Sequence, residues 1–347
     1  MEKFIKEFKN KKILVTGGTG SIGSEIVRQL IPYQPQTIRV FARGEHGHHQ
    51  FKQRLDDNRH ARFIVGDIRD KDRLRLAMDD IDVVFHAAAM KHVDICDNDP
   101  FEAVATNILG TQNIIDIARE LNVGKVIAIS TDKAVNPEGV LGVSKLMAEK
   151  LILNSFYYKG GKSTKFTCVR FGNVLGSNGS ILPLLKRQIM VKNHVTVTDP
   201  DMTRFVMTIP QAVSLVLDAA VQTKGQEIFV LKMPAVKLGD LVNAAVKYYS
   251  SAFGKKHSEI EIKIMGSRSG DKKHEQLLSD HEAGRVLETK DMYILIPKED
   301  VWGYRHKSDY LQIPKEASKN FSSEHAKKLT ENEIIKLIKE IDGTITV

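Results

Sequence analysis

The sequence predicts an α/β fold built on a Rossmann-like, doubly wound parallel sheet with a smaller C-terminal lobe. Short β-branched apolar runs alternate with helical stretches over the first 170 residues. A glycine-rich loop follows the first of these runs and leads into a helix. Beyond Arg170 the alternation loosens and glycines punctuate the chain, which indicates a second structural unit.

The predicted strands are short and lack a clean polar face, as expected for parallel strands buried on both sides. They are Lys12–Thr16, Thr37–Ala42, Ala61–Gly66, Asp82–Ala88, Lys125–Ser130 and Lys165–Arg170. Helical patterns lie between them at Ser21–Leu30, Lys71–Met78, Pro100–Leu121 and Gly142–Ser155. A further helix is expected to start at Leu329–Thr330, where Thr330 and Glu333 form a capping box.

Composition excludes several classes of protein. The 347 residues are 42% hydrophobic and 27% charged, which is typical of a folded globular chain. The net charge of +8 is spread along the sequence without a nucleic-acid-binding motif, so no nucleic-acid partner is expected.

No apolar run approaches the roughly 18–20 residues of a membrane span, and we expect no membrane insertion. The two cysteines give neither a disulfide framework nor a metal-ligand spacing, so no metal site is expected. The charged start, M-E-K-F-I-K-E-F-K-N-K-K, lacks a secretory signal's apolar core and favours a cytoplasmic location.

The glycine loop, T-G-G-T-G-S-I-G, stands between the first strand and a helix, a context that favours dinucleotide binding over an ordinary turn. Gly17 would permit the tight turn, and Gly20 would let the backbone approach a pyrophosphate. Gly23 would let the helix pack closely on the strand. Ser21 and Ile22 belong to the helix N-terminus, whose free N–H groups would face the phosphates.

The end of the second strand bears on the choice of cofactor. Arg43 lies twenty residues past Gly23 and would pair with a 2′-phosphate, which favours NADP. Glu45 follows two residues later, so NAD, although less favoured, is not excluded. After the third strand, the Asp67 carboxylate is expected against the adenine amino group, with Ile68 beside the ring. After the fourth strand, small residues would give a surface for the cofactor: Ala87 and Ala88.

The fifth predicted strand ends in S-T-D-K-A-V-N-P, at the sheet edge where open α/β sheets bind ligands. Together with motifs elsewhere, this segment resembles the extended short-chain dehydrogenase/reductase family. Within that family the chain is most similar to the inverting UDP-N-acetylglucosamine 4,6-dehydratases of bacterial polysaccharide and flagellin-sugar pathways. The resemblance runs from about Lys11 to Pro297 and includes, in order, T-G-G-T-G-S-I-G, H-A-A-A-M-K-H-V, T-N-I-L-G-T, S-T-D-K-A-V-N-P, V-R-F-G-N-V-L-G-S-N-G-S, D-P-D-M-T-R-F, K-M-P-A-V-K and G-S-R-S-G-D-K-K-H-E.

The resemblance implies a reaction in which sugar C4 is oxidised, water is eliminated across C5 and C6, and hydride returns to C6 with inversion at C5. Elimination needs an acid and a base side by side, and the resemblance gives these roles to Asp132 and Lys133. Thr131 and Lys145 complete the implied catalytic set, and Lys145 also binds the cofactor. A lysine base must be partly neutral, which we expect burial beside the cofactor's positive ring to favour.

The resemblance also implies a binding site for a UDP-N-acetylhexosamine. Arg268 and Glu275 are expected at the uridine and diphosphate, since arginine binds a diphosphate bidentately. Lys91 and His92 follow the fourth strand and would touch the diphosphate or the sugar, although His92 fits a packed structural role equally well. The remaining implied contacts are Asn173, Ser180 and Arg204.

Leu141 departs from the superfamily pattern, which has a tyrosine as the oxidation base four residues before Lys145. A leucine cannot carry a proton, so Lys133, Thr131 or Lys145 is left to accept the proton of the C4 hydroxyl. Two alternatives therefore stay open. One is a nucleotide-sugar epimerase, which needs no C6 elimination, and the other is a non-catalytic NADP-binding sensor or scaffold of the same fold.

We expect an NADP-binding Rossmann domain over residues 1–175, with return segments near 205–232. The substrate-binding lobe would comprise residues 176–204 and 233–310, followed by a C-terminal tail and helix over 311–347. Relatives form dimers and hexamers, so a homo-oligomer is the expected assembly.

Overall fold

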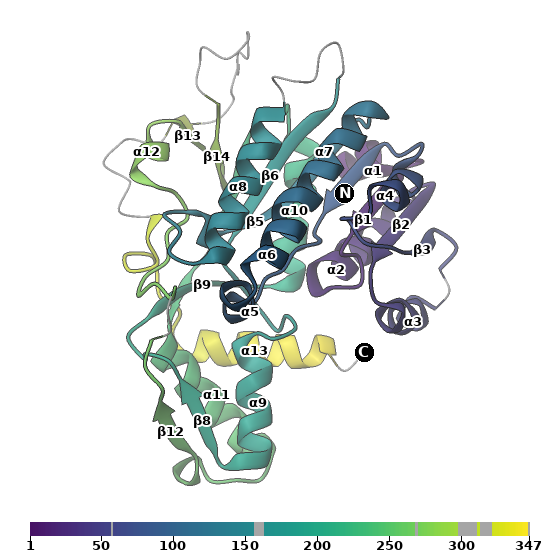
Figure 1. The fold of residues 1–347 in the computed structure, drawn as a ribbon. Helices are drawn as coiled ribbons and strands as arrows, with labels where there is room; N and C mark the ends of the chain where they lie inside the picture. The colour runs from purple at the N-terminus through teal and green to yellow at the C-terminus, as the bar shows by residue number, and fades with distance from the viewer. Residues whose placement is uncertain (57, 156–162, 268–269, 298–310, 313–320, 346–347) are drawn as a thin grey trace.

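The computed structural model describes residues 1–347 except 57, 156–162, 268–269, 298–310, 313–320 and 346–347. Within the described part, ten strands form one sheet in the order β15-β13-β14-β10-β6-β5-β4-β1-β2-β3. The strands from β10 to β3 run parallel, and β14, β13 and β15 continue the sheet with antiparallel pairings. The structure thus confirms the predicted α/β fold with a doubly wound parallel sheet (Figure 1).

The six predicted strands are the first six strands of the structure, and their ends agree within two residues. They are β1 (Lys12–Thr16), β2 (Thr37–Ala42), β3 (Ala61–Val65), β4 (Val83–His86), β5 (Lys125–Thr131) and β6 (Lys165–Phe171). The other strands of the large sheet are β10 (Ile228–Leu231), β13 (Val286–Glu288), β14 (Met292–Leu295) and β15 (Leu311–Gln312). Two smaller sheets contain β7 (Asn173–Leu175), β9 (Thr203–Thr208) and β11 (Ala235–Lys237), and β8 (His194–Val197) and β12 (Glu261–Ile264).

Helices cover both faces of the large sheet (Figure 1). One group packs together as α1 (Glu2–Phe8), α2 (Ser21–Leu30) and α10 (Ile209–Gln222), and another as α4 (Lys71–Met78), α7 (Gly110–Glu120) and α8 (Val140–Asn154). Shorter or peripheral helices are α3 (Glu45–Arg54), α5 (Val93–Asn98), α6 (Pro100–Ala103) and α12 (Asp280–Ala283). No helix in the described ranges is long and apolar enough to cross a bilayer.

The helix predicted over Pro100–Leu121 is present and runs without interruption to Glu120, but its middle part is wider than an α-helix. A π-helical stretch, Val104–Leu109, lies between α6 and α7. Asn107 lies in this stretch, where its amide side chain exchanges hydrogen bonds of 2.8 and 3.2 Å with the backbone of Met90. The wider turn therefore coincides with a side chain that fixes the segment following β4.

The large sheet and the helices packed on it enclose one apolar core. A second apolar core is built by α9 (Ile181–Lys192), α11 (Leu238–Ala252), α13 (Glu331–Ile345) and the strands packed on them. The capping box predicted for α13 is present: the Glu333 carboxylate accepts from the Thr330 backbone N–H, and the Glu333 backbone N–H donates to the Thr330 hydroxyl. The sequence placed residues 233–310 in the second lobe, whereas β13 and β14 pair with the large sheet. The exact domain bounds stay a prediction.

Arg170 on β6 is the largest fully buried side chain of the described chain. Its guanidinium binds Glu149 of α8 through two hydrogen bonds of 2.7 and 3.1 Å. The same group donates to Glu282 of α12 and to the Leu277 carbonyl. This network therefore ties the segment around α12 to the centre of the sheet.

Candidate active site

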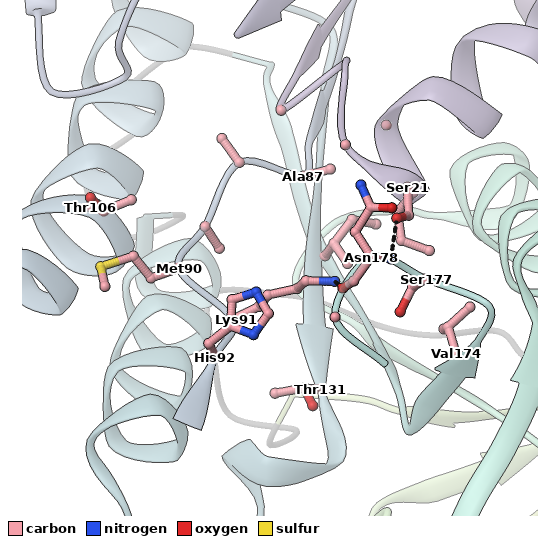
Figure 2. A pocket seen from close by; sticks show the side chains of 18 of the residues that line it. Ser21, Ala87, Met90, Lys91, His92, Thr106, Thr131, Val174, Ser177 and Asn178 are labelled. Atoms are coloured by element: carbon pink, nitrogen blue, oxygen red, sulfur yellow. Dashed lines mark hydrogen bonds between the residues drawn. The ribbon is translucent and has the colours of Figure 1, made fainter. Parts of the chain in front are cut away.

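A cavity of about 750 Å³ opens at the carboxyl ends of β1 to β6. Its walls come from the loops that follow these strands, as expected at the point where the strand order of an open α/β sheet reverses. All the residues predicted to bind the cofactor line it: Gly17, Gly20, Ser21, Ile22, Gly23, Arg43, Asp67, Ile68, Ala87, Ala88 and Lys145. Figure 2 shows part of this wall.

The glycine loop has the close backbone contacts that a pyrophosphate-binding turn requires. Gly17 has a positive φ of 65°, and a side chain there would stand 2.7 Å from the Ala88 backbone nitrogen. A side chain at Gly23 would stand 2.2 Å from the Gly17 carbonyl oxygen. Only glycine fits either position, and the N-terminus of α2 opens onto the cavity beside them. This cradle suits the diphosphate of a dinucleotide.

Arg43 sits at the far end of the cavity and is 59% exposed. Its guanidinium lies 4.0 Å from Asp67 and 3.7 Å from Glu102. Arg69 binds the same two carboxylates at 2.5 Å each, and although burial alone would raise the pKa of Asp67, its bonds to Arg69 hold that pKa below the usual value. Asp67, predicted to face adenine, is therefore also part of a surface ion-pair group.

The predicted acid and base are adjacent at the end of β5. Asp132 is fully buried, and its Oδ1 accepts hydrogen bonds from the Thr131 hydroxyl at 3.0 Å and from Lys133 Nζ at 3.1 Å. Among the described residues, the other oxygen, Oδ2, has no hydrogen-bond partner. It lies against Gly172, where an added side chain would come within 2.9 Å of it. Lys133 is 26% exposed and lines the cavity.

Burial raises the pKa of Asp132, and the charge of Glu275 reinforces this effect against the opposing pull of Lys133. Burial lowers the pKa of Lys133, as expected from the sequence, but the charges of Asp132 and Glu275 outweigh it and raise this pKa above the usual value. The surroundings therefore make Asp132 a weaker acid than a free carboxyl, and they favour the cationic form of Lys133. Lys133 therefore has to lose a proton before it can act as a base.

Leu141 and Lys145 face the cavity from the first turns of α8. Leu141 is 5% exposed and packs with Cys96 and Ala103. Lys145 donates a 2.6 Å hydrogen bond to the Ile129 carbonyl, and burial lowers its pKa. Position 141 thus offers an apolar surface where a tyrosine hydroxyl would otherwise stand.

The residues predicted to bind substrate divide into two groups. Four of them line the cavity: Lys91, His92, Asn173 and Ser180. Arg204 is buried and donates to the carbonyls of Thr203 and Lys273, and it does not line this cavity. Glu275 is also buried, 3.3 Å from Lys133, and lines a separate small cavity of about 10 Å³. Arg268 lies outside the described residues.

The sequence predicted Ser180 in the loop that closes one side of the cavity, but it did not predict how this loop is attached. Asn178 donates its backbone N–H to the Ser21 hydroxyl, and its carbonyl accepts from Lys91 Nζ. Figure 2 shows Asn178 and Lys91 approaching each other from different walls. The G-S-N-G-S motif indicates a loop, but the residues that a loop contacts elsewhere in the chain cannot be read from the motif itself.

Several known proteins are similar to this chain over most of its length. A family model described as polysaccharide biosynthesis protein matches residues 13–297. An uncharacterized membrane protein of Methanocaldococcus jannaschii is 48% identical over 96% of this chain and 97% of its own. The inverting UDP-N-acetylglucosamine 4,6-dehydratase of Campylobacter jejuni serotype O:2 is 40% identical, with 84% of each chain covered.

Two further matches extend the range of known relatives. The UDP-glucose 4-epimerase of Rickettsia bellii is 34% identical over 96% of this chain and 97% of its own. The crystal structure of Pen from Bacillus thuringiensis superimposes with a TM-score of 0.87 at 39% identity, covering 96% of this chain and 98% of Pen. The similarity therefore spans nearly the whole chain.

Proposed function

Because this chain belongs to the polysaccharide biosynthesis protein family, whose model matches residues 13–297, we propose that it is an NADP-dependent UDP-N-acetylglucosamine 4,6-dehydratase that inverts C5. Its relatives are nucleotide-sugar dehydratases and epimerases. The observation that supports elimination is the Asp132–Lys133 pair at the wall of a cavity whose glycine cradle fits a dinucleotide. Acid and base there stand side by side, as removal of water from neighbouring carbons requires.

The cofactor site fits a nicotinamide dinucleotide, which would supply the reversible oxidation at sugar C4. Gly17, Gly20 and the N-terminus of α2 would hold its diphosphate. Arg43 would bind a 2′-phosphate, which favours NADP over NAD. Lys145 would hold the ring end near the acid–base pair, since it lines the same cavity from α8.

The chain's own residues account for the elimination. Lys133, once neutral, accepts the proton from C5, and the electrons of that bond form the C5–C6 double bond. Asp132, whose pKa burial raises, donates its proton to the C6 oxygen as the C6–O bond breaks, and water leaves. Inversion then requires that a proton reach C5 from the opposite face of the sugar.

A direct test is incubation of the protein with UDP-N-acetylglucosamine and NADP in deuterated water. Mass spectrometry should show loss of one water, and proton NMR should show a 4-keto-6-deoxy sugar with deuterium at C5. Unchanged mass with an altered sugar would support an epimerase, the activity named for the Rickettsia relative. Binding of both ligands without any change would support a sensor, the reading that Leu141 leaves open.

The expected homo-oligomer is also a proposal. It is supported by apolar side chains exposed along α6, the π-helical stretch and α8: Phe101, Val104, Leu109, Val143 and Met147. Light scattering coupled to size-exclusion chromatography measures the assembly, and a Phe101→Glu variant should weaken it if this surface joins two copies.

A further inference from the structure

The catalytic turn at residues 132–136 is held by a segment from much later in the sequence, residues 270–276. Lys272 Nζ donates a 2.5 Å hydrogen bond to the Val135 carbonyl. Asn136 Nδ2 donates a 2.7 Å hydrogen bond to Gln276 Oε1. These two bonds fix the segment on both sides of Glu275, which points at Lys133.

Glu275 is itself firmly placed. Its backbone N–H donates to the Ser323 hydroxyl at 2.8 Å, and its carbonyl accepts from the Ser323 backbone N–H at 2.8 Å. The Ser323 hydroxyl also bonds Thr203 at the start of β9. Only 2% of Glu275 is exposed, so its carboxylate cannot turn to solvent and has to find its partners inside the protein.

The Glu275 carboxylate finds the amine of Lys133, which two further oxygens also contact. Lys133 Nζ lies 3.1 Å from Asp132, 3.3 Å from Glu275 Oε1 and 3.3 Å from Asn173 Oδ1. Three oxygens from three separate segments thus fix the amine at the cavity wall. We propose that Glu275 is a positioning residue that holds the Lys133 amine in place at the cavity wall and whose charge acts directly on this amine. The effect of Glu275 on dehydration rests on the proposed function, whereas its effect on the Lys133 amine does not.

Within the described residues, the charged groups that act on Lys133 and Glu275 are Asp132, Arg204 and Lys272. Glu275 opposes the burial of Lys133 and raises its pKa, while Arg204 lowers it. Burial would raise the pKa of Glu275, but Lys133, Arg204 and Lys272 together lower it, so Glu275 stays ionised. Glu275 also raises the pKa of Asp132. Removing its charge should therefore lower the pKa of both the acid and the base.

The first test reads Lys133 without any turnover. Trace acetylation of the full-length protein across a pH series, followed by mass spectrometry, gives the pKa of Lys133 from its rate of labelling. In Glu275→Gln the amide keeps an oxygen for Lys133 but carries no charge. We expect the pKa of Lys133 to fall by at least about one unit, a roughly tenfold faster labelling at a fixed pH below that pKa. The matched control, Glu324→Gln, removes the same charge from a half-exposed carboxylate nearby and should leave Lys133 unchanged.

The second test uses dehydration of UDP-N-acetylglucosamine. The whole pH profile of kcat should move to lower pH in Glu275→Gln, because both members of the acid–base pair titrate at lower pH. Glu275→Ala removes the oxygen as well and should lower kcat at every pH with little change in KM. Glu275→Asp, which keeps the charge, should restore part of the profile. A residue that served packing alone would lower the stability of all three variants without moving the profile.

An unchanged labelling pKa of Lys133 in Glu275→Gln overturns the inference. If that variant does not fold, Glu275→Asp carries the same test, since a shorter carboxylate stands farther from Nζ and should still lower the pKa measurably. Absence of dehydration by the unmodified protein contradicts the proposed function alone, because the labelling result does not depend on turnover.

Discussion

The Ser21 hydroxyl at the start of α2 accepts a 3.0 Å hydrogen bond from the backbone N–H of Asn178, 157 residues further along the chain. Lys91 donates to the carbonyl of the same residue at 2.5 Å. The loop at residues 177–180 is therefore tied to two walls of the cavity (Figure 2). A dinucleotide held against the glycine loop would lie beside this attachment, so we expect its retention to depend on the loop.

Replacing Gly179 tests this dependence. Gly179 has a φ of 72°, and an added Cβ would stand 2.4 Å from His92 Cε1. Gly179→Ala should displace the loop and weaken NADP binding about tenfold or more, since strain and collision together amount to about 1–3 kcal/mol. Gly254→Ala is the matched control, with a φ of 67° and, beyond its chain neighbours, no atom of the described residues within 4 Å of the added carbon. It should lower the melting temperature without altering NADP affinity, and equal losses of affinity in both variants would argue against the loop's role.

Arg43→Ala should reduce NADP affinity about ten- to a hundredfold, because one charge-assisted contact to a phosphate contributes roughly 1.5–3 kcal/mol. NAD lacks the 2′-phosphate and provides the internal control, since its affinity should hardly change. Isothermal titration of both cofactors gives the comparison. If the two affinities fall together, Arg43 supports the fold of this wall through Asp67 and Glu102 and does not read the phosphate.

Asp132→Asn and Lys133→Met should each nearly abolish dehydration, by about 10²–10⁴-fold. Asparagine cannot donate a carboxyl proton to the leaving oxygen, and methionine cannot accept the proton from C5. NADP affinity should be retained in both variants, which separates lost chemistry from lost structure. Product formation and deuterium entry at C5 are the measurements, and substantial turnover in either variant would remove that residue from its role.

Leu141→Tyr should restore a hydroxyl at the position four residues before Lys145. We expect the oxidation step and its pH dependence to change more than the elimination, because Asp132 and Lys133 lie on a different segment. Stopped-flow absorbance of the reduced cofactor follows oxidation, and water loss follows elimination. An equal effect on both would show that position 141 takes part in the proton transfers at C5 and C6.

Local signals predicted much of this structure. The glycine loop, the six strands and the α13 capping box all depend on residues close in sequence, so their patterns could be read directly. The antiparallel pairing of β13 and β14 with the large sheet could not be read, because short strands do not specify their partners. The hydrogen bonds of Asn107 to Met90 could not be read either, because Met90 lies outside the helix that contains Asn107.

In the candidate site too, what depends on strand order could be predicted, whereas contacts between distant segments could not. Residues that follow consecutive parallel strands were predicted together, since topology brings strand ends to one edge. Glu275 and Arg204 were expected at the substrate from motif similarity, but the structure places both in the charged group behind Lys133. That arrangement depends on how residues 270–276 pack on the catalytic turn, which no spacing in the sequence reveals. Roles in catalysis and binding stay predictions for all these residues.

The burial of Arg170 limits how this protein can be recombined with its relatives. A chimera that keeps β6 and α8 but takes the region around α12 from another protein would need an incoming carboxylate where Glu282 now stands. Glu149 alone would then face a guanidinium whose second partner has gone, and breaking a buried ion pair typically destabilises a protein by about 3–5 kcal/mol. Crossover points for exchanging substrate specificity should therefore transfer Arg170 together with its two acidic partners.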